Sequence, residues 1–382
     1  MKSLMLKTSA ILLFGALLFS GCSSSDSDTT PGGIDPQVNN GSGGTTTPPS
    51  SAAWLIPTNC VADGGPGKDG IPSIDNPKFS TDPNANALSF LTNDNLLVAG
   101  IKVGSDIRAY PYSVLNWHEI TNDIVGNKPL GIIYCPLTGT VLAWDRNVNG
   151  SVTEFGVSGL LFNNNIIPYD RNSNSNWSQM LLKSVNGSLK GTEITTHPML
   201  ETSWGTWKAM FPGSKILNAV TGFNRPYGVY PYINGAGQDY RESPWLLFQN
   251  CTNDTRRPVK ERVLGITAAN GNTKVYTFDN FPGSNFTAIE DNFEGEDYVI
   301  VGSKGRNLIV AFNRKQPDGR LLSFDAVQGE LPVILKDNEG NKWTVFGEPA
   351  EGGSLARLAS PAISYMGYFF AFGSFFQNLE IR

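Results

Sequence analysis

Short apolar runs bounded by Gly, Asn and Pro recur along most of the chain. Asn95–Val103 and Leu130–Tyr134 are two such runs, and each has the length expected of a strand. Val141–Arg146 and Ser151–Phe155 flank Asn149-Gly150, a dipeptide typical of a tight hairpin turn. The pattern therefore predicts strands joined by close turns.

Few segments have a helical pattern. Tyr112–Ile120 follows Pro111, which is a favourable residue at the start of a helix. Trp204–Phe211 places three aromatic residues at i, i+3 and i+7 and stops at Pro212-Gly213. With 41 Gly and 24 Pro in 382 residues, short elements are favoured over long helices. We predict a mainly β (α+β) fold with a few short helices.

The pattern occurs twice. Five separated blocks of the first half match blocks of the second half at an offset of 165 to 169 residues. The matching blocks begin at Val98 and Val263, Ala143 and Ala311, Asn149 and Asp318, Asp170 and Asp337, and Trp204 and Phe369. We predict two copies of a β-meander or small-barrel unit, spanning about 95–217 and 260–382 and packed as one body. The first unit extends from 53 to 217, an aromatic-rich connection covers 218–259, and the second unit, 260–382, is degenerate.

The N-terminus has the pattern of a targeting sequence. Lys2 and Lys7 precede a ten-residue apolar run, Ala10–Phe19, which is too short for a permanent membrane span. The run ends in Leu-Phe-Ser-Gly-Cys22, which resembles the lipobox of bacterial lipoproteins and implies cleavage before a lipidated Cys22. An ordinary secretory signal that contains a cysteine is the alternative. We assign 1–21 to the signal peptide and 22–52, rich in Ser, Thr, Gly and Pro, to a disordered tether.

The same resemblance implies a location, and composition limits the partners. Ser23 rather than Asp follows Cys22, which by the sorting rules of such lipoproteins implies the outer membrane, with the folded part facing the periplasm. The formal charge is −5, so there is no basic excess to hold a nucleic acid. No internal apolar run reaches 18 residues, which excludes a polytopic membrane protein. The expected partners are the membrane, through the lipid, and a small molecule or envelope component.

Three cysteines remain after lipidation of Cys22. Cys60 and Cys251 lie in polar, turn-rich segments, whereas Cys135 ends an apolar run. In an oxidising compartment one pair and one free thiol is the simplest outcome. We expect the disulfide Cys60–Cys251 and a free Cys135.

Reactive residues are concentrated in the first half. The strings are R-A-Y-P at 108–111, W-H-E-I-T-N-D at 117–123, Y-C-P-L-T-G at 134–139, F-G-V-S-G-L at 155–160, Y-D-R at 169–171 and S-N-W-S-Q at 175–179. Together they resemble DUF3179, a bacterial domain family of unknown function. Many members of that family have a second Cys where this chain has Thr138, so a two-cysteine motif is not available here. The resemblance implies a fold and a site but names no reaction.

Cys135, His118 and Glu119 are the candidate catalytic and metal-binding residues. Thiolate, imidazole and carboxylate form a ligand set suited to Zn, Cu or Fe. Alternatively, His118 activates Cys135 as a nucleophile, as in a Cys-His hydrolase or transferase, with Glu119 or Asp123 orienting the ring. A third interpretation treats Cys135 as a small buried apolar residue and His118 as bonded to a backbone carbonyl.

Further residues around this centre are candidate ligand-binding groups. They are Arg108, Tyr110, Asp123, Asp170, Arg171, Trp177 and Gln179. Arg108, Asp170 and Arg171 are expected to form one ion-pair set, either structural or a clamp for an anion. Trp117, Trp144, Trp177, Trp204 and Trp207 are expected in the core rather than as stacking platforms. His197 lies in a polar loop and belongs to none of the motifs that carry the family resemblance, so it is not among the main candidates.

The second half serves as an internal control. Cys135 aligns with Ser303 and Arg108 with Lys274, and 279–289 contains no His. What the halves share is expected to be framework, and what only the first half has is a candidate for function. Two hypotheses follow: a transition-metal-binding protein or metal-dependent enzyme, and a non-catalytic ligand-binding or scaffold lipoprotein.

Overall fold

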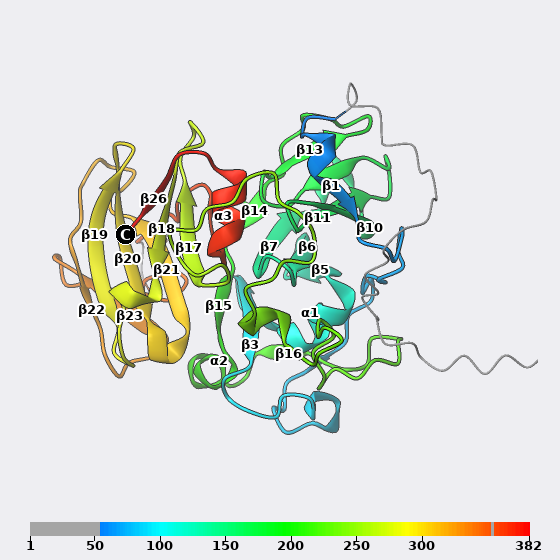
Figure 1. Ribbon diagram of the computed structural model, residues 1–382. Helices are drawn as coiled ribbons and strands as arrows, with labels where there is room; N and C mark the ends of the chain where they lie inside the picture. Colours follow the sequence, from blue (N-terminus) through cyan, green and yellow to red (C-terminus); the bar gives the residue numbers. More distant parts are fainter. Residues whose placement is uncertain (1–53, 353–354) are drawn as a thin grey trace, which may run out of the picture. The chain divides into compact units, whose positions relative to one another are not determined.

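The computed structural model describes residues 54–352 and 355–382, and its main elements are strands (Figure 1). The predicted signal peptide, lipidated Cys22 and tether lie outside the described residues. Three α-helices are present in the described part: α1 (Tyr112–His118), α2 (Trp204–Met210) and α3 (Phe369–Phe375). In these residues no helix combines the length and apolar character needed to cross a membrane. The predicted mainly β class is confirmed.

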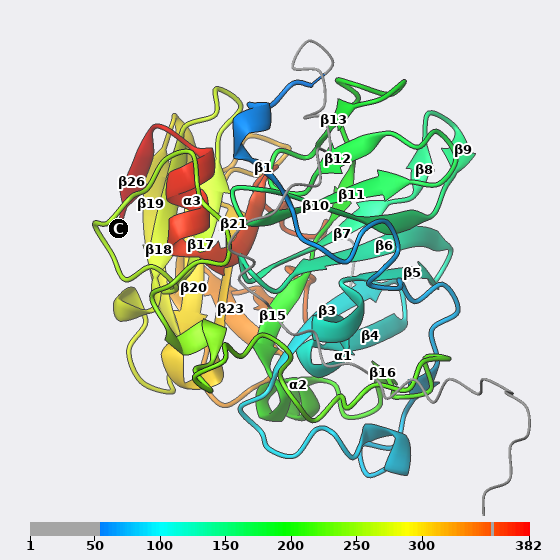
Figure 2. The same cartoon turned by 45° about the vertical axis from the view of Figure 1, so that its right-hand side comes forward.

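Three sheets and a short hairpin come from the first half of the chain (Figure 2). The first sheet has the order β1 (Val61–Asp63), β10 (Phe155–Phe162), β11 (Asn165–Asp170), β12 (Asn176–Ser178) and β13 (Lys183–Asn186). The second has the order β14 (Thr196–His197), β7 (Thr140–Asp145), β6 (Lys128–Cys135) and β5 (Ile120–Val125). The third has the order β15 (Leu200–Ser203), β3 (Leu97–Val103), β4 (Asp106–Pro111), β16 (Lys215–Leu217) and β2 (Phe79–Ser80). The hairpin pairs β8 (Asn147–Val148) with β9 (Ser151–Val152).

Three sheets come from the second half. One has the order β25 (Ser364–Tyr368), β17 (Arg262–Thr267), β18 (Thr273–Thr277) and β26 (Leu379–Ile381). Another joins β19 (Thr287–Phe293), β20 (Glu296–Ser303) and β21 (Leu308–Asn313). The last joins β22 (Phe324–Ala326), β23 (Val333–Asp337) and β24 (Lys342–Thr344). Residues of both halves share two hydrophobic cores.

The halves have corresponding pairings. Ile120 pairs with Ile133 in β5–β6, and Ala288 pairs with Val301 in β19–β20, each 168 positions further on. The parallel pairing of β16 with β4 has its counterpart in the parallel pairing of β26 with β18. A Cβ added to Gly100 would lie 1.8 Å from the Trp207 ring, and one on Gly265 would lie 2.1 Å from the Phe372 ring. In both places glycine lets an aromatic ring of a helix, α2 in the first half and α3 in the second, lie against the strand.

The aromatic expectations are met in the described core. All five tryptophans named above are buried, and Trp144, Trp177 and Trp207 are among the largest fully buried side chains. The hairpin at Asn149-Gly150 is shorter than predicted: its strand pairing ends at Asn147 and Val152, and Phe155 begins β10 in another sheet.

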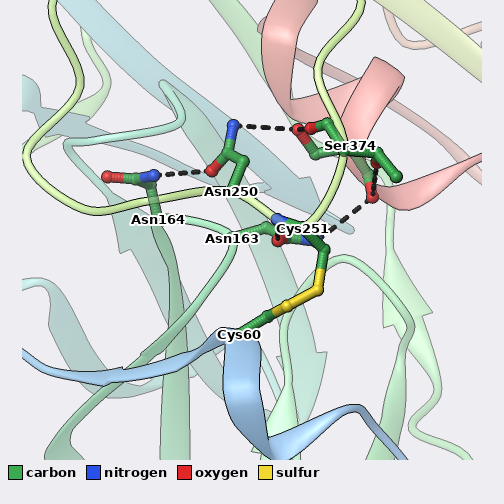
Figure 3. Close-up of a disulfide and its surroundings, with 7 residues drawn as sticks. Cys60, Asn163, Asn164, Asn250, Cys251 and Ser374 are labelled. Atoms are coloured by element: carbon green, nitrogen blue, oxygen red, sulfur yellow. Dashed lines mark hydrogen bonds between the residues drawn. A yellow bond between two sulfur atoms is a disulfide. The ribbon is translucent and has the colours of Figure 1, made fainter.

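The predicted disulfide Cys60–Cys251 is present and lies beside the turn between β10 and β11 (Figure 3). Asn163 and Asn164 form this turn with φ of 48° and 61°, a conformation that Asn tolerates. The Asn163 side chain accepts a hydrogen bond from the Cys251 amide at 2.8 Å and donates one to the Ser374 carbonyl at 3.1 Å. The disulfide and this turn therefore fix part of the 218–259 connection against the first half and α3.

Candidate functional site

Arg108, Tyr110 and Asp123 form a closed ion-pair network. The Arg108 guanidinium donates to both Asp123 carboxylate oxygens at 2.7 and 2.8 Å, and Tyr110 donates its hydroxyl to the same carboxylate at 2.6 Å. Arg108 also bonds Asp106 at 2.6 Å, and these hydrogen bonds hold the pKa of Asp106 below its ordinary value. The charged groups of this network are therefore mutually satisfied.

Asp170 and Arg171 belong to two further, separate networks. Asp170 accepts hydrogen bonds from the backbone of Ser173 and from the Trp177 indole at 3.0 Å. Arg171 donates to Asp75 and Glu154, each at 2.7 Å. The predicted single set of Arg108, Asp170 and Arg171 is wrong, because consecutive residues of an extended chain project to opposite sides.

The same contacts recur in the second half. Lys274 pairs with Asp291 at 2.8 Å, where Arg108 pairs with Asp123 in the first half. Tyr276 donates its hydroxyl to Asp291 at 3.0 Å. The Trp343 indole donates to Asp337 at 2.9 Å, as Trp177 does to Asp170. Networks that both halves contain fit a framework role better than a site specific to one half.

His118, the last residue of α1, is fully buried with both ring nitrogens bonded. Its Nδ1 lies 2.7 Å from the Pro72 carbonyl oxygen and its Nε2 lies 2.7 Å from the Tyr227 hydroxyl. Burial lowers the pKa of His118 to about 4, so the ring is neutral at neutral pH. A carbonyl only accepts, so Nδ1 carries the proton and the Tyr227 hydroxyl donates to Nε2.

Glu119 directly follows the helix with a backbone φ of 57°, in the left-handed range that favours Gly or Asn. Its side chain is buried, with 7% of the residue exposed, and accepts a hydrogen bond from the Tyr232 hydroxyl at 3.2 Å. Burial raises the pKa of Glu119 to about 7, against the smaller opposing effect of that bond. The carboxyl group is therefore poised to exchange a proton near neutral pH.

Cys135 lies on the neighbouring strand and is 1% exposed. The Tyr134 amide donates to the Glu119 carbonyl at 2.7 Å, which sets the two segments side by side. The Cys135 thiol lies 3.4 Å from the Asn164 carbonyl oxygen. Burial, with a contribution from the Glu119 charge, raises the pKa of Cys135 to about 11. The thiol is therefore protonated at neutral pH, the opposite of an activated nucleophile.

A buried polar network lies beyond Cys135. Gln179 donates to the Ile133 carbonyl at 2.7 Å and accepts from the Thr140 hydroxyl at 2.6 Å and from Asn165 at 2.7 Å. Thr138 accepts from Asn165 at 2.9 Å. Gln179 therefore holds the turn after Cys135 through hydrogen bonds to the strands on both sides of it. Both its amide nitrogen and its amide oxygen are used in these bonds.

The predicted trio of Cys135, His118 and Glu119 does not converge. Glu119 and Cys135 are neighbours, whereas His118 is held by Pro72 and Tyr227, because the left-handed turn at Glu119 directs consecutive side chains to different surroundings. Within 54–352 and 355–382, no group of three or more His, Cys, Asp and Glu side chains is placed to hold a metal ion. The arrangement supports neither a three-ligand metal centre nor a Cys-His pair.

Sequence reasoning did not identify the tyrosines of the 218–259 connection as part of this centre. Tyr232 bonds Glu119 and Tyr227 bonds His118, both from more than 100 residues away. The buried Tyr230 hydroxyl has no hydrogen-bond partner among the described residues, and Arg241 lies over its ring at 3.9 Å. The clustering of Tyr227, Tyr230 and Tyr232 within six positions was the available signal.

A comparison with protein families gives a match to "Protein of unknown function (DUF3179)" over residues 68–379. Comparisons with curated proteins and with solved structures found no match. The family match covers both halves and the connection between them. It therefore includes Glu119 with its neighbours His118, Cys135, Tyr227 and Tyr232, which we call the Glu119 centre. The chain belongs to the DUF3179 family.

Proposed function

We propose that this chain is a lipoprotein anchored in the outer membrane and facing the periplasm, whose folded part is a duplicated module with one acid–base site at Glu119. The anchoring is supported by the apolar run before Cys22 and by the polar 22–52 segment that follows it. The paired Cys60 and Cys251 fit an oxidising compartment.

Duplication is supported by matching register and matching contacts. The β5–β6 and β19–β20 pairings share one offset, and at that offset Phe286, Thr287 and Ser303 correspond to His118, Glu119 and Cys135. The second half therefore keeps the ion-pair networks of the framework but has none of these three side chains.

One observation carries the acid–base proposal: a buried carboxyl group stands on a left-handed, non-glycine backbone position with a single hydroxyl partner. Backbone strain of this kind costs about 1–3 kcal/mol and clusters at functional sites. A carboxyl with a pKa near neutrality can both accept and donate a proton at working pH.

The chemistry that follows is proton transfer to or from a bound small molecule. Glu119 as carboxylate takes a proton from the ligand, and as carboxylic acid it returns that proton. Tyr232 positions the carboxyl through its hydrogen bond, and the thiol of Cys135 lies on the neighbouring strand. The transition-metal and Cys-His alternatives require His118 to approach Cys135, and the bonds of His118 to Pro72 and Tyr227 oppose this.

Infrared difference spectroscopy of the full chain in detergent tests the proposal. Comparison of wild type with Glu119→Gln across pH should reveal one carboxyl that loses its proton near pH 7. Glu154→Gln, which changes a partly exposed, ion-paired carboxyl, is the matched control. A Glu119 that titrates near its ordinary pKa of 4.5 refutes the proposal.

Turnover provides the second test. Wild type and Glu119→Gln are each incubated with a small-molecule extract of the cell envelope, and the compounds are followed by mass spectrometry. We expect at least one compound to be converted by wild type and not by the variant. Equal conversion by both proteins, or by neither, refutes an acid–base role for Glu119.

A further inference from the structure

A cavity of about 260 Å³ lies between strands of the two halves, away from the Glu119 centre. Its walls come from β7, β14 and β15 on one side and from β17, β21 and β25 on the other. The lining combines apolar side chains, among them Leu142, Met199, Ile309, Phe312 and Met366, with several polar groups. The volume is close to the lower end of small-molecule sites, about 300 Å³.

Arg357 supplies a positive charge at this cavity that is not engaged in an ion pair among the described residues. Among the described residues its guanidinium has no hydrogen bond or ion pair. Glu348, the carboxylate whose charge acts on Arg357, is itself ion-paired with Lys102. Arg357 is an exposed residue of the lining, so its guanidinium is accessible to a ligand that enters from solvent.

His197 is the second polar group available at the cavity. Burial is the main cause that lowers the pKa of His197, and the nearby charges of Lys128 and Arg357 act in the same direction. Its Nε2 lies 3.8 Å from Asp145, which is too far for a hydrogen bond. The neutral ring can therefore donate to or accept from a ligand.

Two other polar side chains of the lining, Glu201 and Tyr365, are already committed. Glu201 accepts hydrogen bonds from Arg262 at 2.8 Å and from Tyr112. Tyr365 donates its hydroxyl to the Met180 carbonyl at 3.1 Å. The negative charge of Glu201 is therefore neutralised by Arg262, and the remaining charge in the lining is that of Arg357.

We propose that this cavity binds a small amphipathic anion, with a carboxylate on Arg357 and an apolar body between the two halves. Contact of the ligand's apolar body with the apolar side chains of the lining contributes about 25 cal/mol per Å² of buried apolar surface. A guanidinium suits a carboxylate because its parallel N–H groups match the two oxygens. The site is independent of Glu119, and its ligand need not be the one on which Glu119 acts.

Isothermal titration of the full chain in detergent with octanoate, and separately with octanol, tests the proposal. We expect octanoate to bind more tightly than octanol to wild type. Arg357→Met should weaken octanoate binding at least tenfold and leave octanol binding unchanged, and Arg357→Lys should restore part of the loss. Lys336→Met removes an exposed cation outside the lining and should change neither.

Ala362→Trp gives a second, independent readout. Ala362 is exposed and lines the cavity, so a large ring there should occupy the space without disturbing the core, and binding of both probes should be lost. The proposal is overturned if octanoate fails to bind wild type. It is also overturned if octanoate binds Arg357→Met or Ala362→Trp as tightly as wild type.

Discussion

Replacement of Glu119 by Gln should stabilise the protein at alkaline pH and have a much smaller benefit at acid pH. The folded state holds the Glu119 proton up to about pH 7, whereas the unfolded chain releases it near the ordinary pKa of 4.5. Between these values the native state binds more protons than the unfolded state, so stability falls as pH rises. Gln has the same shape and never ionises, so the variant lacks this loss.

The magnitude follows from the two pKa values. A separation of about 2.5 pH units at roughly 1.4 kcal/mol per unit gives about 3 kcal/mol. His118 acts in the opposite direction, because its pKa falls from 6.5 to about 4 on folding. The native state then binds fewer protons than the unfolded state in that window, so stability rises with pH by about 3 kcal/mol. In wild type the pH dependence of stability caused by Glu119 and that caused by His118 therefore largely cancel.

Urea unfolding with the disulfide intact, at about pH 5 and about pH 8, measures the effect. The free energy of unfolding of Glu119→Gln minus that of wild type should increase by about 3 kcal/mol between these conditions. Glu154→Gln, which removes a partly exposed carboxyl paired with Arg171, is the matched control for the loss of one negative charge. A difference that stays constant with pH, or that decreases, refutes the assignment of a near-neutral pKa to Glu119.

Three further outcomes are expected. Reduction of Cys60–Cys251 should lower the free energy of unfolding by up to about 5 kcal/mol, because the bond joins residues 191 positions apart. A urea midpoint that falls by less than one tenth of its value in the oxidised protein contradicts this. Cys135 should resist iodoacetamide in the native state, and rapid labelling of the native protein contradicts its burial. Glu119→Gln should lower the pKa of Cys135, because the variant removes a nearby negative charge. Peptide mapping of the alkylation rate against pH measures both effects. Gly100→Ala and Gly265→Ala should each destabilise by about 3 kcal/mol or more through overlap with Trp207 and Phe372, whereas Gly213→Ala, with open space around it, should have almost no effect in the same urea assay.

Local chemistry explains which elements the sequence predicted well. Pro111 precedes α1 as expected, and Asn149 and Gly150 both adopt the positive φ that a tight hairpin turn requires. The aromatic spacing of Trp204–Phe211 matches α2. These signals depend on residues within a few positions of one another, so a single stretch of sequence contains them completely.

Contacts between distant segments account for what the sequence did not predict. Adjacent residues His118 and Glu119 were expected to act together, but the sign of φ at Glu119 separates their side chains. The partners that decide their chemistry, Tyr227 and Tyr232, come from the connection and reach the site only through tertiary packing. The cavity at Arg357 likewise depends on how strands of both halves meet.

The second half bears on whether the fold itself requires Glu119. There, Phe286 and Thr287 occupy the positions that the strand register assigns to His118 and Glu119, and Thr287 is an ordinary strand residue. The same strand pairing therefore forms with neither a buried carboxyl nor a left-handed backbone at the position that corresponds to Glu119. If the halves share an ancestor, as we propose, the first half keeps two destabilising features that its framework does not need. Proton transfer between the carboxyl group and a ligand then explains best why both features persist. For this reason Glu119, rather than Cys135 or His118, is the residue to test first.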